Sequence, residues 1–198
     1  DNGANIDITN STGATPIHIT AQLPSSSMTE FLISQNAQPD IPDRDNETPL
    51  FIAITANCLP SVTSLLDAGA DVNHANNSKV TPLHLASKFG FVDMAQTLIE
   101  RGAETNVKDN QHSTPLHYAT IAQNAEIVKL LLDNNADPLI KNVHGKSPIS
   151  LANAKIAEIL CGSLVKHAIA QDQEEQAHKE EEEQGGTMEE EDQNNGFH

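Results

Sequence analysis

Three histidines, whose side chains could take part in acid–base or metal chemistry, occur at matching places in the sequence. His18, His84 and His117 each lie three residues after a threonine. An imidazole can act as a general base or as a metal ligand near neutral pH. The spacing argues against both roles, because one histidine per repeated unit places the rings in a row instead of around one substrate or ion. Two further units have Phe51 and Ser150 at this position, which excludes a catalytic device shared by all units.

Other signals of catalysis or metal binding are missing from the sequence. It has no HExxH, P-loop, GxSxG or dinucleotide-binding motif, and the His/Cys spacings of a zinc site are absent. Cys58 and Cys161 lie about three repeats apart and cannot pair within a stack. Such sparse cysteine usage favours a reducing compartment, and therefore an intracellular location in cytoplasm or nucleus. We expect no enzyme activity, no cofactor and no metal in this segment.

The histidines belong to a unit that recurs along the chain. Its first marker falls 33 residues apart four times running, at Thr15-Pro16, Thr48-Pro49, Thr81-Pro82, Thr114-Pro115 and Ser147-Pro148. A second marker keeps the same step, beginning at Gly3, Asn36, Gly69, Gly102 and Asn135. Two markers with one period indicate a supersecondary unit that is repeated and stacked.

Each unit is predicted to contain two short helices. The threonine can cap the first free N–H groups of a helix, and proline suits its first turn. In the third unit an apolar run follows Pro82, Gly90 breaks the pattern, and helical spacing resumes at Val92 and ends at Arg101-Gly102. The histidine just after the helix start can bond the threonine hydroxyl or the adjacent loop backbone. Because helices this short are unstable alone in water, neighbouring units must complete the core.

The third and fourth units spell the motif most clearly, as VTPLHLA from Val80 and STPLHYA from Ser113. This 33-residue period with T-P-L-H-x-A resembles the ankyrin repeat family, over residues 1 to about 160. The resemblance implies an all-α repeat solenoid, an ankyrin-like stack of helix–turn–helix units with projecting β-hairpin-like loops. Several positions depart from the motif and affect local geometry there: Thr20, Pro24, Phe51, Asn57-Cys58-Leu59-Pro60 and Gln123.

The two ends of the sequence differ from the middle. It opens with DNGANID, which in other copies follows a second helix, so we infer a fragment of a longer protein or a processed chain. The last unit has lost four residues before Ile156, so its helices should be shortened or fused. We expect an ankyrin array with a C-terminal capping helix over residues 1–170. Residues 171–198 should form an acidic, Glu-rich tail, partly helical or disordered.

Charge limits the kinds of partner. The formal net charge is −17, and the tail holds eleven acidic residues and one lysine. The acidity argues against binding to nucleic acid or to an anionic membrane. The tail either solubilises the protein or contacts a basic partner surface, for example by mimicking nucleic acid. No signal peptide or membrane-spanning run is present, and we expect a monomer with a protein partner.

The resemblance implies that partners contact the loop tips and the exposed face of the first helix. These positions vary between units while the framework repeats. Phe89 and Ile121 should be partly solvated, one repeat apart, and able to anchor a partner; alternatively, both pack against the inter-helix turns. The candidate partner-binding residues are Phe89, Ile121, Lys88, Arg44, Glu47, Asn77, Val80, Asn110, Gln111 and His144.

Three functions are consistent with the sequence. The first is a non-catalytic protein-interaction module. The second is the C-terminal ankyrin part of a secreted or injected effector or toxin, and the third is the targeting arm of a larger enzyme. The resemblance also implies that Asn73 and Asn106 occupy the loop position that some ankyrin proteins present for hydroxylation.

Overall fold

The computed structural model describes residues 5–165. The chain divides by its contacts into a unit of residues 1–159 and a unit of residues 160–198. The boundary predicted at residue 170 and the acidic tail lie outside the described residues. Within residues 5–165 the backbone is helical or irregular, with no strand. The helices of the first unit are α1 (Pro16–Ala21), α2 (Ser27–Ser34), α3 (Pro49–Thr55), α4 (Leu59–Asp67), α5 (Pro82–Phe89), α6 (Val92–Glu100), α7 (Pro115–Ile121), α8 (Ala125–Asp133) and α9 (Pro148–Leu151).

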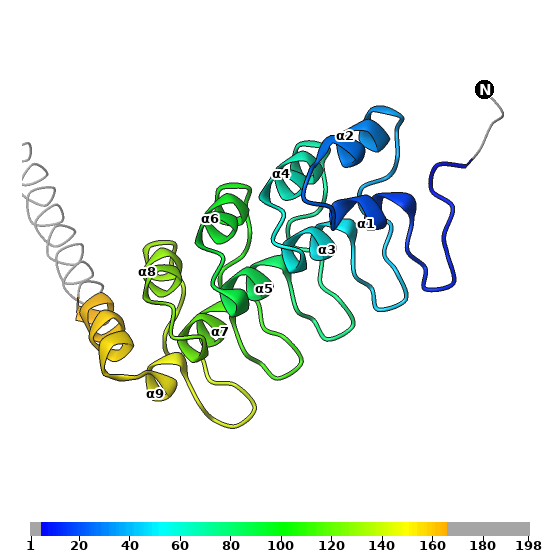
Figure 1. Cartoon of the computed structure of the whole chain (residues 1–198). Helices are drawn as coiled ribbons and strands as arrows, with labels where there is room; N and C mark the ends of the chain where they lie inside the picture. Colours follow the sequence, from blue (N-terminus) through cyan, green and yellow to red (C-terminus); the bar gives the residue numbers. More distant parts are fainter. Residues whose placement is uncertain (1–4, 166–198) are drawn as a thin grey trace, which may run out of the picture. The chain divides into compact units, whose positions relative to one another are not determined.

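The first unit is a stack of antiparallel helix pairs. The first helices α1, α3, α5, α7 and α9 pack successively in one row, and the second helices α2, α4, α6 and α8 pack in another. Long loops project from the row of first helices towards the same side (Figure 1). A further helical stretch begins at residue 154 and reaches residue 165, the last one described. The predicted solenoid of helix–turn–helix units is therefore confirmed.

The helix starts follow the local sequence. Thr15, Thr48, Thr81, Thr114 and Ser147 are extended N-cap residues, each followed by proline in the first turn. Proline is favourable there because it lacks an N–H that would have no intrahelical acceptor. The left-handed backbone needed after α5 is supplied by Gly90, with φ of 79°. The last first helix, α9, has only four residues, as the shortened final unit predicted.

Equivalent side chains of successive repeats form the core. Leu50, Leu83 and Leu116 of the first helices are at most 1% exposed. One turn later Ala53, Ala86 and Ala119 are fully buried, and their small size lets neighbouring helices approach closely. The second helices contribute further buried residues, namely Val62, Leu65, Ala95, Leu98, Val128 and Leu131. Because each layer is closed by the next one, burial depends on stacking.

The departures from the motif are accommodated within the repeat. Thr20 replaces the buried alanine of the first repeat, and its hydroxyl donates to the Ile17 carbonyl and accepts from the Thr29 hydroxyl at 3.1 Å. Gln123 takes the left-handed position that Gly90 holds one repeat earlier, with φ of 57°. The helix pairs are kept in both repeats, so these changes alter local contacts and leave the fold intact.

Candidate functional site

The repeated spacing of threonine and histidine builds a contact between neighbouring repeats. The Thr81 N–H donates to His84 Nδ1 at 3.1 Å, and the Thr81 hydroxyl lies 2.8 Å from the same nitrogen. A backbone amide can only donate, so Nδ1 is unprotonated and the proton lies on Nε2. Nε2 then donates to the Ser113 carbonyl of the next repeat at 3.0 Å. The same pattern joins Thr15, His18 and Glu47, and Thr114, His117 and Lys146.

These contacts give the histidines a structural role, as the sequence predicted. His18, His84 and His117 are at most 2% exposed. Burial lowers the pKa of each imidazole, although the hydrogen bond to the carbonyl opposes this shift. Both ring nitrogens of each neutral histidine are engaged in hydrogen bonds. The rings are therefore not free to take a proton from a substrate or to bind a metal ion.

The second repeat shows what happens without the histidine. Phe51 occupies its position and is 1% exposed. Within the described part of the chain, the buried hydroxyl of Thr48 then has no hydrogen-bond partner. In the last repeat a serine replaces the histidine, and Ser150 Oγ accepts from the Ser147 N–H at 3.0 Å. Thr48 therefore lacks the hydroxyl partner that histidine gives the N-cap threonine in the first, third and fourth repeats.

The hairpin-like loop tips are built by an aspartate or asparagine at their first position. In the fourth repeat Asp109 Oδ1 accepts from the N–H groups of Gln111 and Ser113, both at 2.8 Å. Successive tips are joined by one backbone hydrogen bond, as from the Asn110 N–H to the Ser78 carbonyl at 3.0 Å. We call the five tips by their residues: 10–14, 43–47, 76–80, 109–113 and 142–146. These hydrogen bonds hold the tips in register and fix the positions of their outward side chains.

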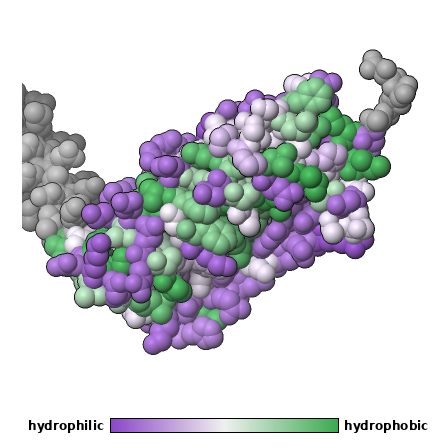
Figure 2. Space-filling model, in the orientation of Figure 1, coloured by the Kyte–Doolittle hydropathy of each residue, from purple (hydrophilic) through white to green (hydrophobic). Residues whose placement is uncertain are grey.

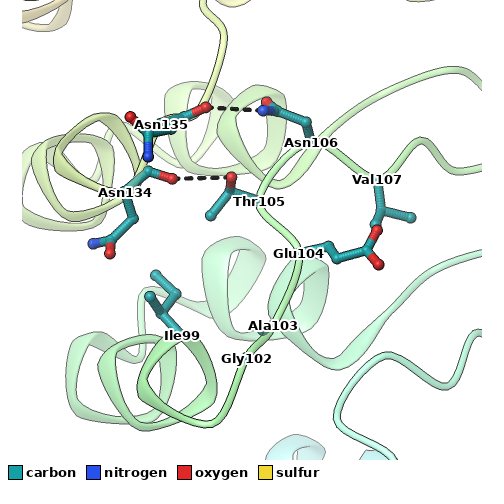
Figure 3. A pocket seen from close by; sticks show the side chains of 9 residues that line it. All are labelled: Ile99, Gly102, Ala103, Glu104, Thr105, Asn106, Val107, Asn134 and Asn135. Atoms are coloured by element: carbon teal, nitrogen blue, oxygen red, sulfur yellow. Dashed lines mark hydrogen bonds between the residues drawn. The ribbon is translucent and has the colours of Figure 1, made fainter.

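A second set of side chains ties the loops behind the tips to the next repeat. Asn106 Oδ1 accepts from the Asp137 N–H at 2.8 Å, and its Nδ2 donates to the Asn135 carbonyl at 2.8 Å. Thr105 Oγ1 donates to the Asn134 carbonyl at 3.1 Å in the same hollow (Figure 3). This hollow of about 560 Å³ lies between residues 102–107 and the end of α8. Its polar groups largely bond one another, and no residue predicted to bind a partner lines it.

A different pocket lies beside the first helices and does include predicted residues. It has a volume of about 320 Å³ and is lined by Lys88, Asp109, Gln111, Ser113, Tyr118, Ile121 and Ala122. We call it the groove pocket, because α5, α7 and tip 109–113 form its walls. Figure 2 shows apolar side chains gathered over the middle helices, whereas the edge formed by the tips is largely hydrophilic.

Tyr118 and Asp109 form the inner side of the groove pocket and were missed by sequence reasoning. The Tyr118 hydroxyl donates to Asp109 Oδ2 at 2.7 Å, and the carboxylate is only 5% exposed. Burial, reinforced by this hydrogen bond, raises the pKa of Tyr118. A signal was present in the sequence, because Tyr118 is the only tyrosine and falls where the other complete repeats have Ile19, Ile52 and Leu85.

Phe89 and Ile121 are both solvated, but they have different surroundings. Ile121 is 63% exposed at the rim of the groove pocket. Phe89 is 43% exposed and does not line the pocket. Its ring lies 5.5 Å from that of Phe91 in the inter-helix turn, and Lys88 Nζ lies 5.6 Å from its centroid. Phe89 is therefore partly exposed, as predicted, and it also packs against the inter-helix turn, which was the alternative prediction.

The other predicted residues are distributed over four tips. The exposed ones are Arg44, Asn77, Asn110, Gln111 and His144, whereas Glu47 and Val80 are half-buried. Some of the polar groups are engaged between tips. Asn77 Nδ2 donates to the Arg44 carbonyl at 3.2 Å, and Asn110 Nδ2 donates to the Asn77 carbonyl at 3.1 Å. The groove pocket brings together only Lys88, Gln111 and Ile121.

The repeat geometry agrees with the comparison to known families. A model of ankyrin repeats, in three copies, matches residues 2–76 and 73–142. The chain belongs to the ankyrin repeat family. Ankyrin repeats are generally modules for protein–protein interaction and are generally non-catalytic. A comparison with curated proteins finds no match.

Residues 5–165 of this ankyrin array offer neither a metal site nor a membrane-spanning helix. In that range no group of three or more His, Cys, Asp or Glu side chains could hold a metal ion. None of the helices between those residues is both long and apolar enough to cross a membrane. Cys58 and Cys161 are free thiols, and Cys58 is buried.

Proposed function

We propose that this ankyrin array is a non-catalytic module that binds a partner protein through its loop tips and the groove pocket. The observation that carries the proposal is the exposure of Ile121 and Phe89, at 63% and 43%, next to a closed core. Large apolar side chains exposed beside a pocket are common anchors of protein interfaces. The tips add polar groups on a framework that hydrogen bonds already hold in place, so little ordering is needed on binding.

The proposal includes the residues around these anchors. Lys88 and Gln111 line the pocket with Ile121. The remaining members of the interface are Arg44, Glu47, Asn77, Val80, Asn110 and His144. We also propose that the array acts as a monomer. We propose in addition that it works inside the cell, where thiols such as those of Cys58 and Cys161 stay reduced.

Affinity capture with the full chain tests the function. The wild type and a Phe89→Ala, Ile121→Ala double variant are compared by quantitative mass spectrometry, and a protein retained by the wild type is then titrated in purified form. We expect each substitution to weaken binding by about 1–3 kcal/mol while the thermal midpoint changes little.

Phe31→Ala is the matched control, because Phe31 is 56% exposed on α2 and lies outside the groove pocket. It should leave binding unchanged. Loss of thermal stability with full affinity in the Phe89→Ala protein would show that Phe89 belongs to the core and would contradict its assignment as an anchor.

A further inference from the structure

The binding face consists of the first helices and the loop tips, to which the proposed function assigns partner binding. Its charges are distributed unevenly along the stack. Across α5, α7, α9 and the tips 76–80, 109–113 and 142–146, the exposed charged side chains are Lys79, Lys88 and Lys146. These segments contain one acidic residue, Asp109, which is 5% exposed and bonded to Tyr118 and to its own tip. The binding face of the last three repeats is therefore positively charged.

The surrounding surface has the opposite sign. Tip 43–47 of the second repeat holds three carboxylates and one arginine, namely Asp43, Asp45, Glu47 and Arg44. The segments 90–108 and 125–141, which contain α6 and α8, hold six carboxylates against the four cations Arg101, Lys108, Lys129 and Lys141: Asp93, Glu100, Glu104, Glu126, Asp133 and Asp137. With a net charge of −17 for the whole chain, an acidic partner meets attraction mainly on the binding face of the last three repeats.

The groove pocket lies within this positive region. Its volume of about 320 Å³ suits a side chain rather than a large ligand, and Ile121 supplies exposed apolar surface at its rim. Lys88 is the one exposed charged residue in its lining. Asp109 keeps its negative charge, but it is 5% exposed and its two carboxylate oxygens accept hydrogen bonds from Gln111, Ser113 and Tyr118, so the exposed charge in the lining is that of Lys88.

We infer that the partner presents an acidic peptide segment with one large apolar side chain. The apolar side chain enters the groove pocket against Ile121, and carboxylates beside it pair with Lys88 and with Lys79 or Lys146 on the flanking tips. The acidic tip 43–47 repels such a segment, so the bound peptide extends towards the C-terminal repeats. This inference rests on the proposed protein-binding function and specifies the chemistry of the partner.

Selection from a displayed library of random dodecapeptides on the full-length protein tests the inference. We expect the enriched peptides to combine a Leu, Ile or Phe with two or more Asp or Glu residues. The best peptide, made synthetically, should bind Lys88→Glu at least tenfold more weakly than wild type, because the substitution places like charges together. Its affinity should also fall as salt rises from 50 to 300 mM, since added ions screen exposed charges.

Lys129→Glu is the matched control, because it makes the same charge change at an exposed position of α8. It should change the affinity less than twofold. Enriched peptides that are neutral or basic, or that bind Lys88→Glu as tightly as wild type, overturn the acidic-partner inference and leave the protein-binding function standing. If the library yields no peptide whose binding depends on Ile121 or Phe89, the result contradicts both the acidic-partner inference and the protein-binding function.

Discussion

His84 and Tyr118 meet edge to face across the junction of the third and fourth repeats, with their ring centroids 5.2 Å apart. The same two residues are joined through the fourth loop tip. His84 donates to the Ser113 carbonyl, the Ser113 N–H donates to Asp109, and Asp109 accepts from the Tyr118 hydroxyl. The histidine of one repeat, the loop tip of the next and the inner side of the groove pocket therefore form one closed network.

Removing the central histidine should destabilise the array. His84→Ala leaves the Thr81 N–H without a partner, removes one of the two hydrogen bonds to the Ser113 carbonyl, and opens a cavity at a fully buried position. We expect the free energy of unfolding to fall by about 2–4 kcal/mol. Urea denaturation measures the change. His144→Ala is the control, because His144 is exposed, and it should stay within about 0.5 kcal/mol of wild type.

The buried histidines should make the protein less stable in mild acid. Burial lowers the pKa values of His18, His84 and His117 below the usual histidine value of 6.5. As pH falls below 6.5 the unfolded chain takes up protons at these positions before the folded chain does, so acidification favours unfolding. The denaturant midpoint should therefore decrease between pH 7.5 and pH 5. A His84→Gln variant should show a shallower dependence, and an equal slope in both proteins would contradict this account.

The second repeat offers a matched test of the threonine–histidine contact. Thr81→Val removes a hydroxyl that bonds His84, and we expect a loss of about 1–2 kcal/mol. Thr48→Val removes a buried hydroxyl with no partner in the described residues, so stability should change by less than about 0.5 kcal/mol or increase. Thermal unfolding of the two variants compares them directly. Equal losses would show that histidine is not what makes the hydroxyl stabilising.

Backbone conformation predicts opposite effects for two equivalent turns. Gln123 has φ of 57°, a left-handed conformation that costs energy in residues with a side chain. We expect Gln123→Gly to stabilise the protein by about 0.5–1 kcal/mol. Gly90→Ala should destabilise it by about 1–2 kcal/mol, because φ is 79° there and a new Cβ would lie 3.0 Å from Asn124 Nδ2. Chemical denaturation of both variants measures whether the free energy of unfolding rises for Gln123→Gly and falls for Gly90→Ala.

Asn106 should contribute to the coupling between the third and fourth repeats. Asn106→Ala removes both hydrogen bonds to the next repeat, and we expect a loss of about 1–2 kcal/mol. Asn106→Asp should cost less, because it keeps the acceptor and Asp40 already accepts from the Asp71 N–H at the equivalent position. Denaturation curves that show no loss for the alanine variant would contradict the assigned role.

Intact mass after cellular expression separately tests hydroxylation of Asn73 and Asn106.

The repeat and its local geometry can be predicted from short stretches of sequence. Helix starts at threonine–proline pairs and turns at residues such as Gly90 depend on a few neighbouring residues, so a 33-residue period was enough to predict the stack. Local spacing also predicted that each histidine would bond its own threonine or the adjacent loop. Both contacts are present in the structure.

Which side chains share a surface depends on how the repeats pack against one another. Lys88, Asp109 and Ile121 come from two different repeats, and they line one pocket because α5, α7 and a loop tip pack together. The contact of Phe89 with Phe91 and the burial of Asp109 by Tyr118 likewise depend on side-chain directions that periodicity does not encode. Burial and electrostatic environment arise from all neighbours at once, and most of these neighbours are distant in the sequence.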